Sequence, residues 1–141
     1  MLVDCSNCAK SNRVPAARLL DRARCAACKA ALLPVEHPVA LRDVADFDEL
    51  IRDAKVPVLV DFWAAWCGPC RAVAPEVEKL ARQKHGQLIV AKVDTDALPE
   101  LSARYSIRSI PTLIVFRDSR EAKRISGAMP ASAMAAQLGL G

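Results

Sequence analysis

The chain has 141 residues and a formal net charge of +4, with 52% hydrophobic and 4% aromatic residues. This length suits one compact domain with a small appendage, and the apolar fraction is high enough for a core that needs no disulfide staples. No apolar run approaches the length that spans a membrane, and the N-terminus lacks the basic and apolar regions of a signal peptide, so we expect a cytoplasmic protein with no membrane partner.

The six cysteines form three CxxC pairs: Cys5/Cys8, Cys25/Cys28 and Cys67/Cys70. Because no export signal is visible, structural disulfides are disfavoured, and cysteine pairs at this spacing indicate metal binding or redox catalysis. The two residues between the members of a pair also make it a poor staple for distant parts of a fold. The chain therefore predicts metal binding, thiol redox chemistry, or both.

Residues 1–33 repeat one CxxC unit, and sixteen residues separate the two pairs. Four thiolates at this spacing can close a tetrahedron around one ion, which leaves no open position for catalysis. We predict a zinc-ribbon-like module, too short to fold without its metal, in which one structural zinc ion is held by Cys5, Cys8, Cys25 and Cys28. The alternative is that these cysteines are free or transiently oxidised thiols.

The net charge of the chain is confined to this N-terminal module. Residues 1–33 carry six basic and two acidic side chains, whereas the remainder carries fourteen of each. A basic zinc module can bind nucleic acid, but this one has no aromatic side chain to stack on a base, and four thiolates with one dication would remove about half of the charge. We therefore expect a solvated basic face and no nucleic-acid partner.

Residues 34–38 contain two prolines, which resist both helix and sheet. We interpret them as a linker between the module and a main domain over residues 39–141, and we expect weak coupling between the two parts. His37 of this linker is not needed as a metal ligand beside four cysteines. On this interpretation the main domain needs no residue of the module in order to fold.

The main domain shows alternating strand and helix patterns. An edge strand over residues 39–41 precedes a helix capped by Asp43, and the apolar run over 58–62 is typical of a central strand covered on both faces. The pattern then predicts a helix over 71–85, a strand over 88–93, a short helix over 99–105, antiparallel strands over 112–116 and 121–126, and a helix from Pro130. The expected class is α/β, a mixed central sheet flanked by helices.

Between the central strand and its helix stands Trp66-Cys67-Gly68-Pro69-Cys70. A thiol at a helix N-terminus lies at the positive end of the helix dipole, which favours the thiolate, and the thiolate is the nucleophile of disulfide exchange. We assign the attack to Cys67, which lies nearer the substrate. Cys70 would then displace the captured target, while Gly68 and Pro69 keep the loop tight enough for closure.

Asp61 interrupts the apolar central strand. A carboxylate in such surroundings is costly to ionise, so its pKa should be raised. In register it would lie beneath the dithiol, where it could exchange a proton with Cys70, and Lys92 on the neighbouring strand is a candidate partner. The alternative is a structural carboxylate held by local hydrogen bonds.

Several of these segments resemble the thioredoxin family. The run from Val60 to Cys70 is similar to the active-site signature of that family, and Ile110-Pro111-Thr112 is similar to the segment where its members hold a cis proline beside the dithiol. The likeness covers roughly residues 38–140 and includes Val93-Asp94-Thr95-Asp96 and Gly127. With its N-terminal extension, the whole chain is similar to bacterial thioredoxins that carry a zinc-binding module.

The resemblance implies a thioredoxin fold, a proton-transfer role for Asp61 and a flat, mostly apolar rim that binds extended segments of target proteins. We expect this rim around Cys67 to consist of Trp66, Gly68, Pro69, Ile110, Pro111, Gly127 and Ala128. The resemblance also implies an NADPH-dependent thioredoxin reductase as the partner that returns electrons to the dithiol. This chain has no Gly-rich nucleotide fingerprint of its own, so we expect no bound nucleotide cofactor.

We therefore predict a monomeric protein-disulfide reductase that acts on target proteins through a mixed disulfide. An oxidant or isomerase is one alternative, because only family likeness connects the Gly-Pro dipeptide with reduction. A zinc-dependent redox sensor or redox-regulated chaperone is another, in which thiol oxidation ejects the metal and exposes a binding surface.

Overall fold

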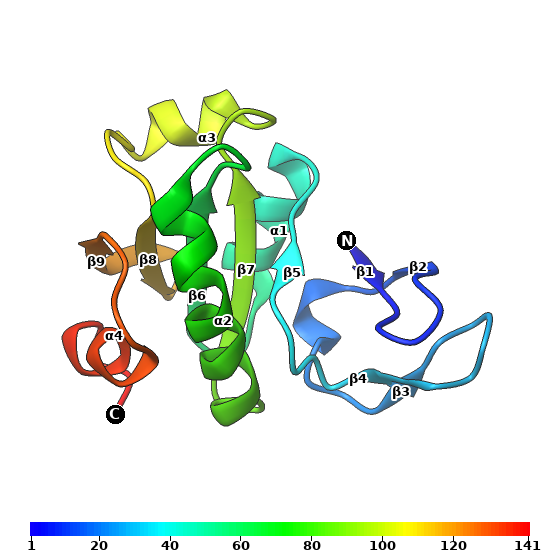
Figure 1. Cartoon of the computed structure of the whole chain (residues 1–141). Helices are drawn as coiled ribbons and strands as arrows, with labels where there is room; N and C mark the ends of the chain where they lie inside the picture. Colours follow the sequence, from blue (N-terminus) through cyan, green and yellow to red (C-terminus); the bar gives the residue numbers. More distant parts are fainter.

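The N-terminal part of the chain consists of two small hairpins (Figure 1). The structure, a computed structural model, describes residues 1–141. A 3-10 turn separates the hairpins, and the elements in order are β1 (Leu2–Asp4), β2 (Ser11–Arg13), η1 (Ala16–Arg18), β3 (Ala23–Arg24) and β4 (Ala31–Leu33). Each hairpin is antiparallel and carries one CxxC pair at its tip.

The two hairpin tips have the same backbone conformation. In each, the N–H of the first cysteine donates to the carbonyl oxygen five residues on, over 2.9 Å and 2.8 Å. The residue after each second cysteine is left-handed, with Ala9 at φ 64° and Lys29 at φ 66°. The sequence repeat is therefore also a structural repeat.

The main domain is built on a five-stranded sheet in the order β5-β7-β6-β8-β9. β5 (Val39–Ala40), β7 (Ile89–Asp94) and β6 (Val58–Trp63) are parallel, whereas β8 (Thr112–Arg117) runs antiparallel to β6 and β9 (Arg120–Ser126) antiparallel to β8. The helices are α1 (Val44–Asp53), α2 (Gly68–Gln83), α3 (Pro99–Arg104) and α4 (Ala131–Gln137). This order and the mixed sheet confirm the predicted fold class. None of these helices has the length and apolar character that a membrane span requires.

Alternate residues of the central strand enter two different apolar layers. Val60 and Phe62 of β6 belong to the layer that contains Phe47 of α1. Leu59 of the same strand belongs to the layer that contains Val77 of α2. Because both faces of β6 are covered, its sequence is apolar on both faces rather than alternating, apart from Asp61. Asp61 is two residues from Leu59 and therefore lies on the face that α2 covers.

Two helix starts show how local sequence positions the elements. Asp43 caps α1 by accepting a hydrogen bond from the N–H of Asp46 over 2.7 Å, as predicted. α2 begins at Gly68, earlier than the predicted Arg71, because Pro69 fits the first turn, where its missing N–H leaves no helical bond unmade. The CxxC pair of α2 therefore spans the helix N-cap and first turn.

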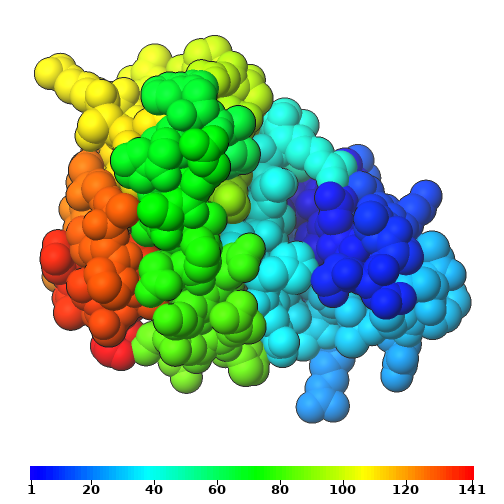
Figure 2. Space-filling view, viewed as in Figure 1, coloured from blue at the N-terminus to red at the C-terminus, as the bar shows by residue number.

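The N-terminal module packs directly against the main domain, which corrects the expectation of weak coupling. Figure 2 shows the residues at the start of the chain pressed against the segment that follows residue 35. Val14 and Leu19 of the module share one buried cluster with Leu50 of α1. Val35, in the expected linker, is 3% exposed, and its N–H donates to the carbonyl oxygen of Leu19 over 3.2 Å. The sequence does not predict this contact, because the strands of the module are short and contain few apolar residues. The division of the chain at residues 34–38 stays a prediction.

Candidate active site and metal centre

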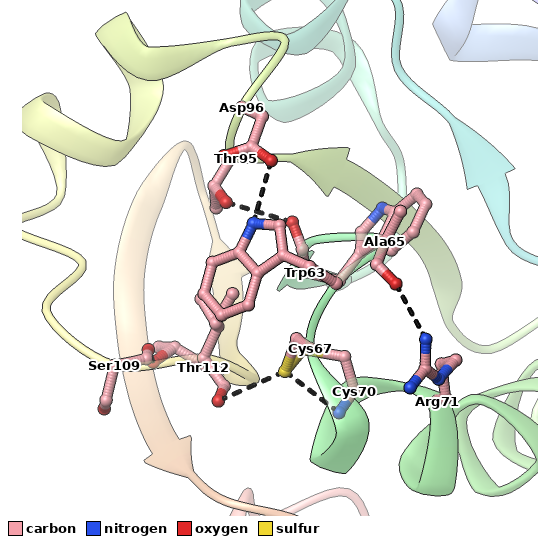
Figure 3. Close-up of a disulfide and its surroundings, with 11 residues drawn as sticks. Trp63, Ala65, Cys67, Cys70, Arg71, Thr95, Asp96, Ser109 and Thr112 are labelled. Atoms are coloured by element: carbon pink, nitrogen blue, oxygen red, sulfur yellow. Dashed lines mark hydrogen bonds between the residues drawn. A yellow bond between two sulfur atoms is a disulfide. The ribbon is translucent and has the colours of Figure 1, made fainter.

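Cys67 occupies the N-cap of α2, where the strand-to-helix turn directs its sulfur at the first helical N–H groups. Its Sγ accepts a hydrogen bond from the N–H of Cys70 over 3.2 Å (Figure 3). Cys67 and Cys70 are joined by a disulfide, with their Cα atoms 5.2 Å apart. The helix N-terminus would stabilise negative charge on Cys67 once the disulfide is reduced.

The segment before β8 forms one wall beside the dithiol. The Ile110–Pro111 peptide bond is cis, and the Ile110 carbonyl oxygen lies 3.6 Å from Sγ of Cys67. The N–H of Gly127 donates to the carbonyl oxygen of Pro111 over 2.9 Å, which places the end of β9 next to this wall. Gly127 has φ +92°, a conformation that glycine adopts without strain.

The predicted rim residues are mostly accessible. Trp66 is 68% exposed, and Gly68, Pro69, Gly127 and Ala128 are also exposed, whereas Ile110 is half-buried and Pro111 is buried. The structure thus brings Ile110, Pro111 and Gly127 together beside Cys67. No contact connects Ala128 to the dithiol beyond its place after Gly127, and the roles of all these residues in binding stay predictions.

Trp66 is held in place by an acid that the sequence reading did not assign. Its indole Nε1–H donates to Oδ2 of Asp96 over 2.9 Å, the hydrogen bond drawn as the dashed line that ends at Asp96 in Figure 3. Behind it, the N–H and the hydroxyl of Thr95 both donate to the carbonyl oxygen of Trp63, over 2.9 Å and 3.1 Å. These bonds tie the β7–α3 turn to the strand that leads into the dithiol.

A cavity of about 240 Å³ opens beside Trp66, between α3 and the segment that precedes β8. Ser102 is one of its lining residues, and the Oγ of Ser102 is shielded from solvent and has no hydrogen-bond partner in the protein. The cavity is lined by Trp66, Thr95, Pro99, Ser102, Ile107, Arg108, Ser109 and Ile110. The cavity extends the predicted rim toward α3. The sequence of α3 does not predict this cavity, because its walls come from three separate segments of the chain.

Asp61 lies on the face of β6 that α2 covers, the same face as Leu59. It is 1% exposed, and neither carboxylate oxygen has a hydrogen-bond partner in the protein. Burial raises the pKa of Asp61 to about 6, and the positive charge of Lys92 opposes part of that shift. The predicted alternative, local hydrogen bonds to the carboxylate, is absent, so the strand holds an acid that titrates near neutral pH.

The four N-terminal cysteines converge in one cluster. All their Sγ atoms lie within 4.8 Å of one another. The Sγ atoms of Cys5 and Cys28 are 3.7 Å apart and those of Cys8 and Cys25 are 3.6 Å apart, so each of these pairs joins the two hairpins. A tetrahedral zinc site with Zn–S bonds of about 2.3 Å separates its sulfurs by about 3.8 Å, so the donor set fits this ion.

Two asparagines surround the cysteine cluster with N–H donors. The backbone N–H of Asn7 lies 3.4 Å from Sγ of Cys5, and its side-chain amide lies 3.5 Å from Sγ of Cys28. The side-chain amide of Asn12 lies 3.6 Å from Sγ of Cys25. Such donors orient metal-bound thiolates and disperse their charge. Sequence reasoning missed both residues, although Asn within and just after a CxxC tip is a usable signal.

Hydrogen bonds favour the thiolate form of two of these cysteines. The N–H of Cys28, followed by the N–H of Ala27 and the amide of Asn12, lowers the pKa of Cys25 to about 6. The amide of Asn7 is the main cause of the lowered pKa of Cys28. A backbone hydrogen bond from Lys10 lowers the pKa of Cys8, but burial and the three neighbouring thiols outweigh it and raise that pKa to about 11. Deprotonated sulfur is the form that binds metal, so binding of a cation by all four sulfurs would release the proton of Cys8.

Comparison with known proteins decides the family. The sequence profile described as Thioredoxin matches residues 38–139. The chain belongs to the thioredoxin family. A second profile, described as Thioredoxin 2, N-terminal, matches residues 5–30, which include all four clustered cysteines. Thioredoxins are thiol-disulfide oxidoreductases, and this thioredoxin carries the matching dithiol at Cys67 and Cys70.

Individual relatives agree with this assignment. Thioredoxin C-3 of Corynebacterium nephridii is 43% identical over 129 residues, which cover 92% of this chain and 87% of that protein. Thioredoxin 1 of a Nostoc species is 47% identical over 92 residues, which cover 65% of this chain and 86% of that protein. Among solved structures, a mutant thioredoxin from Halobacterium salinarum NRC-1 superposes with a TM-score of 0.68 at 32% identity, covering 74% of this chain and 90% of its own.

Proposed function

We propose that this thioredoxin is a protein-disulfide reductase in which Cys67 is the attacking thiol. The observation that supports the assignment is the N-cap position of Cys67, where Sγ accepts the N–H of Cys70 at 3.2 Å. That arrangement favours a thiolate on Cys67 and leaves Cys70 as the inner, resolving thiol. A role as oxidant or isomerase uses the same atoms in reverse, and no contact in the site favours it.

The reaction transfers two electrons from the dithiol to the target disulfide. The Cys67 thiolate attacks one target sulfur, forms a mixed disulfide and releases the other target sulfur as a thiolate. The Cys70 thiolate then attacks Sγ of Cys67, which forms the internal disulfide and releases the second target thiolate. Both departing thiolates take up protons, so the target is reduced as the protein is oxidised.

Asp61 would act as the proton acceptor for Cys70. Its pKa of about 6 lets the carboxylate be ionised at neutral pH and still gain a proton readily. It lies on the α2 side of β6, and α2 carries Cys70 in its first turn. Its free oxygens leave it able to accept the thiol proton directly or through water.

We propose that target proteins bind as extended segments over the rim around Cys67. Trp66 supplies a large exposed apolar surface, and the cis Ile110–Pro111 wall offers a backbone carbonyl oxygen beside the reacting sulfur. The cavity beside Trp66 would accept one side chain of the target, with the exposed Arg108 at its edge. These features demand little of the target sequence, which suits a reductase of many proteins.

We also propose that Cys5, Cys8, Cys25 and Cys28 hold one structural zinc ion. The ion would join the two hairpins and offer no open position for chemistry. Four unpaired cysteines and a reducing dithiol suit a reducing compartment such as the cytoplasm. An NADPH-dependent thioredoxin reductase is the expected electron donor, by family likeness.

The decisive experiment couples this protein to NADPH and a bacterial thioredoxin reductase with insulin as the target. We expect continuous NADPH oxidation and insulin reduction that depend on Cys67. Turnover of insulin without Cys67, or no turnover with any reductase or with dithiothreitol as the donor, would contradict the proposed reductase. Metal analysis of the same preparation is expected to give one zinc ion per chain.

A further inference from the structure

The first hairpin of the N-terminal module, β1–β2, is anchored to the main domain at both ends of its ladder. Figure 1 places this hairpin beside β5 and near α1, and η1, which follows it, contacts α1. Val3 and Val14, on the two sides of the hairpin, are buried in the cluster that includes Leu50 of α1. The contact therefore has an apolar centre, and two charged residues of the main domain lie at its edges.

Glu49 of α1 binds one end of this hairpin with both carboxylate oxygens. Oε1 lies 3.1 Å from the backbone nitrogen of Met1, and Oε2 accepts the N–H of Ala16 over 2.7 Å. Met1 also pairs with Val14 at the open end of the β1–β2 ladder. Because η1 has no capping side chain of its own, Glu49 satisfies the N–H group at the start of that turn.

Arg42 binds the other end of the same ladder. Its guanidinium donates to Oδ1 of Asp4 and, over 3.1 Å, to Oγ of Ser11. Asp4 and Ser11 are register partners, and Asp4 directly precedes the metal-cluster residue Cys5. Arg42 itself stands immediately before the N-cap of α1, so the start of that helix and the cysteine tip are connected through one side chain.

We propose that Arg42 and Glu49 form a docking pair that binds the first hairpin, so that metal bound by the four cysteines stabilises the main domain and not only the module. Bound metal would hold the two hairpin tips in one conformation, which fixes the positions of Asp4 and Ser11 beside the first tip. Arg42 and Glu49 then hold the start and the middle of α1 against the ordered hairpin. A ligand that binds only the folded state raises the stability of every part that unfolds together with its site. The inference rests on the proposed zinc site.

The test uses the full chain, with its Cys67–Cys70 disulfide intact and under anaerobic conditions that keep the other thiols reduced. Trp63 and Trp66 both lie in the main domain, so tryptophan fluorescence during urea unfolding reports on that domain alone. We expect a single zinc ion per chain and a higher urea midpoint for the zinc-bound than for the chelated protein. In E49Q and R42Q, we expect zinc still to bind and the zinc-dependent shift of the midpoint to fall by at least half.

The matched controls are E78Q and R120Q, because both side chains are exposed and have no partner in the protein. They should keep the full zinc-dependent shift. Hydrogen exchange of the Ala16 amide supplies a second readout, which should be at least tenfold faster in E49Q than in E78Q while zinc stays bound.

If zinc binds but leaves the midpoint unchanged, or if E49Q and R42Q keep the full shift, the docking proposal is overturned and the zinc site stands. If no metal binds, both proposals fall, and metal analysis separates the two failures.

Discussion

Asp61 and Lys92 are register partners in the β6–β7 ladder, yet their side chains form no ion pair. The ammonium of Lys92 lies over the ring of Trp63, 4.5 Å from its centroid, and the carboxylate of Asp61 has no hydrogen-bond partner in the protein. Lys92 therefore acts on Asp61 only through its charge, which opposes the effect of burial without cancelling it. The expected ion pair is replaced by a cation–π contact, and the acid keeps a raised pKa.

The raised pKa makes the ionised form of Asp61 destabilising. The folded pKa of about 6 exceeds the ordinary value of 3.8, so the contribution of Asp61 to the free energy of unfolding is largest below pH 4 and falls as the pH rises through 6, by about 3 kcal/mol in total. Asp61→Asn should remove this loss, with a gain of about 3 kcal/mol at pH 8 and little change at pH 4. Denaturant unfolding of the oxidised protein at both pH values measures it.

The same substitution should slow insulin reduction between pH 6 and 8, because the proton acceptor for Cys70 is lost. Turnover that matches the wild type across this range would return Asp61 to a purely structural role, even if the gain in stability is observed.

The two cysteines of the dithiol should differ when each is replaced by serine. Cys70→Ser retains the N-cap thiol, so it should attack insulin and accumulate a mixed disulfide that no second thiol resolves. Cys67→Ser should neither reduce nor trap the target. Non-reducing electrophoresis with mass spectrometry identifies the adduct, and trapping by Cys67→Ser would reverse the assignment.

Asp96 should contribute to target binding by holding Trp66. In Asp96→Ala the indole loses its acceptor at 2.9 Å, and the loss of one such hydrogen bond, about 1 kcal/mol, corresponds to a rise of about fivefold in KM for a protein target. The kcat should change little, because the dithiol and Asp61 are untouched. Steady-state kinetics beside the exposed control Glu78→Ala test this split, and a fall in kcat at constant KM would argue against it.

Deleting residues 1–33 should lower stability but preserve the reaction. The deletion uncovers apolar surface around Leu50 and leaves Glu49 without its two partners, at a cost of about 2 kcal/mol, comparable to exposing one large apolar side chain. The dithiol, the cis-proline wall and Asp96 all belong to the main domain. Urea unfolding of the shortened chain measures the loss of stability, and insulin reduction measures the retained activity. A shortened chain that is folded but inert would show that the module takes part in the chemistry.

The parts of this protein that follow local rules could be predicted from its sequence. Asp43 marks the start of α1, the apolar run of β6 marks a doubly covered strand, and the CxxC spacing marks the cysteine cluster. The contacts of Glu49 and Arg42 with the first hairpin could not be predicted. Polar residues in or beside a helix are expected to face solvent, and only the three-dimensional structure places a distant hairpin against them. Likewise, Asp96 becomes a site residue only because its turn meets Trp66 in three dimensions.

The repeated hairpins have a consequence for the symmetry of the cysteine cluster. Exchanging one hairpin for the other converts the close pair Cys5–Cys28 into the close pair Cys25–Cys8, and the left-handed residues Ala9 and Lys29 exchange as well. To a bound cation the two hairpins are therefore equivalent halves related by an approximate two-fold axis. To the rest of the protein they are not, because Arg42 and Glu49 contact only the first half and the start of η1. A pseudosymmetric centre is thus attached asymmetrically: both hairpins contribute apolar residues to the cluster that contains Leu50, but only the first is also held by charged side chains of the main domain.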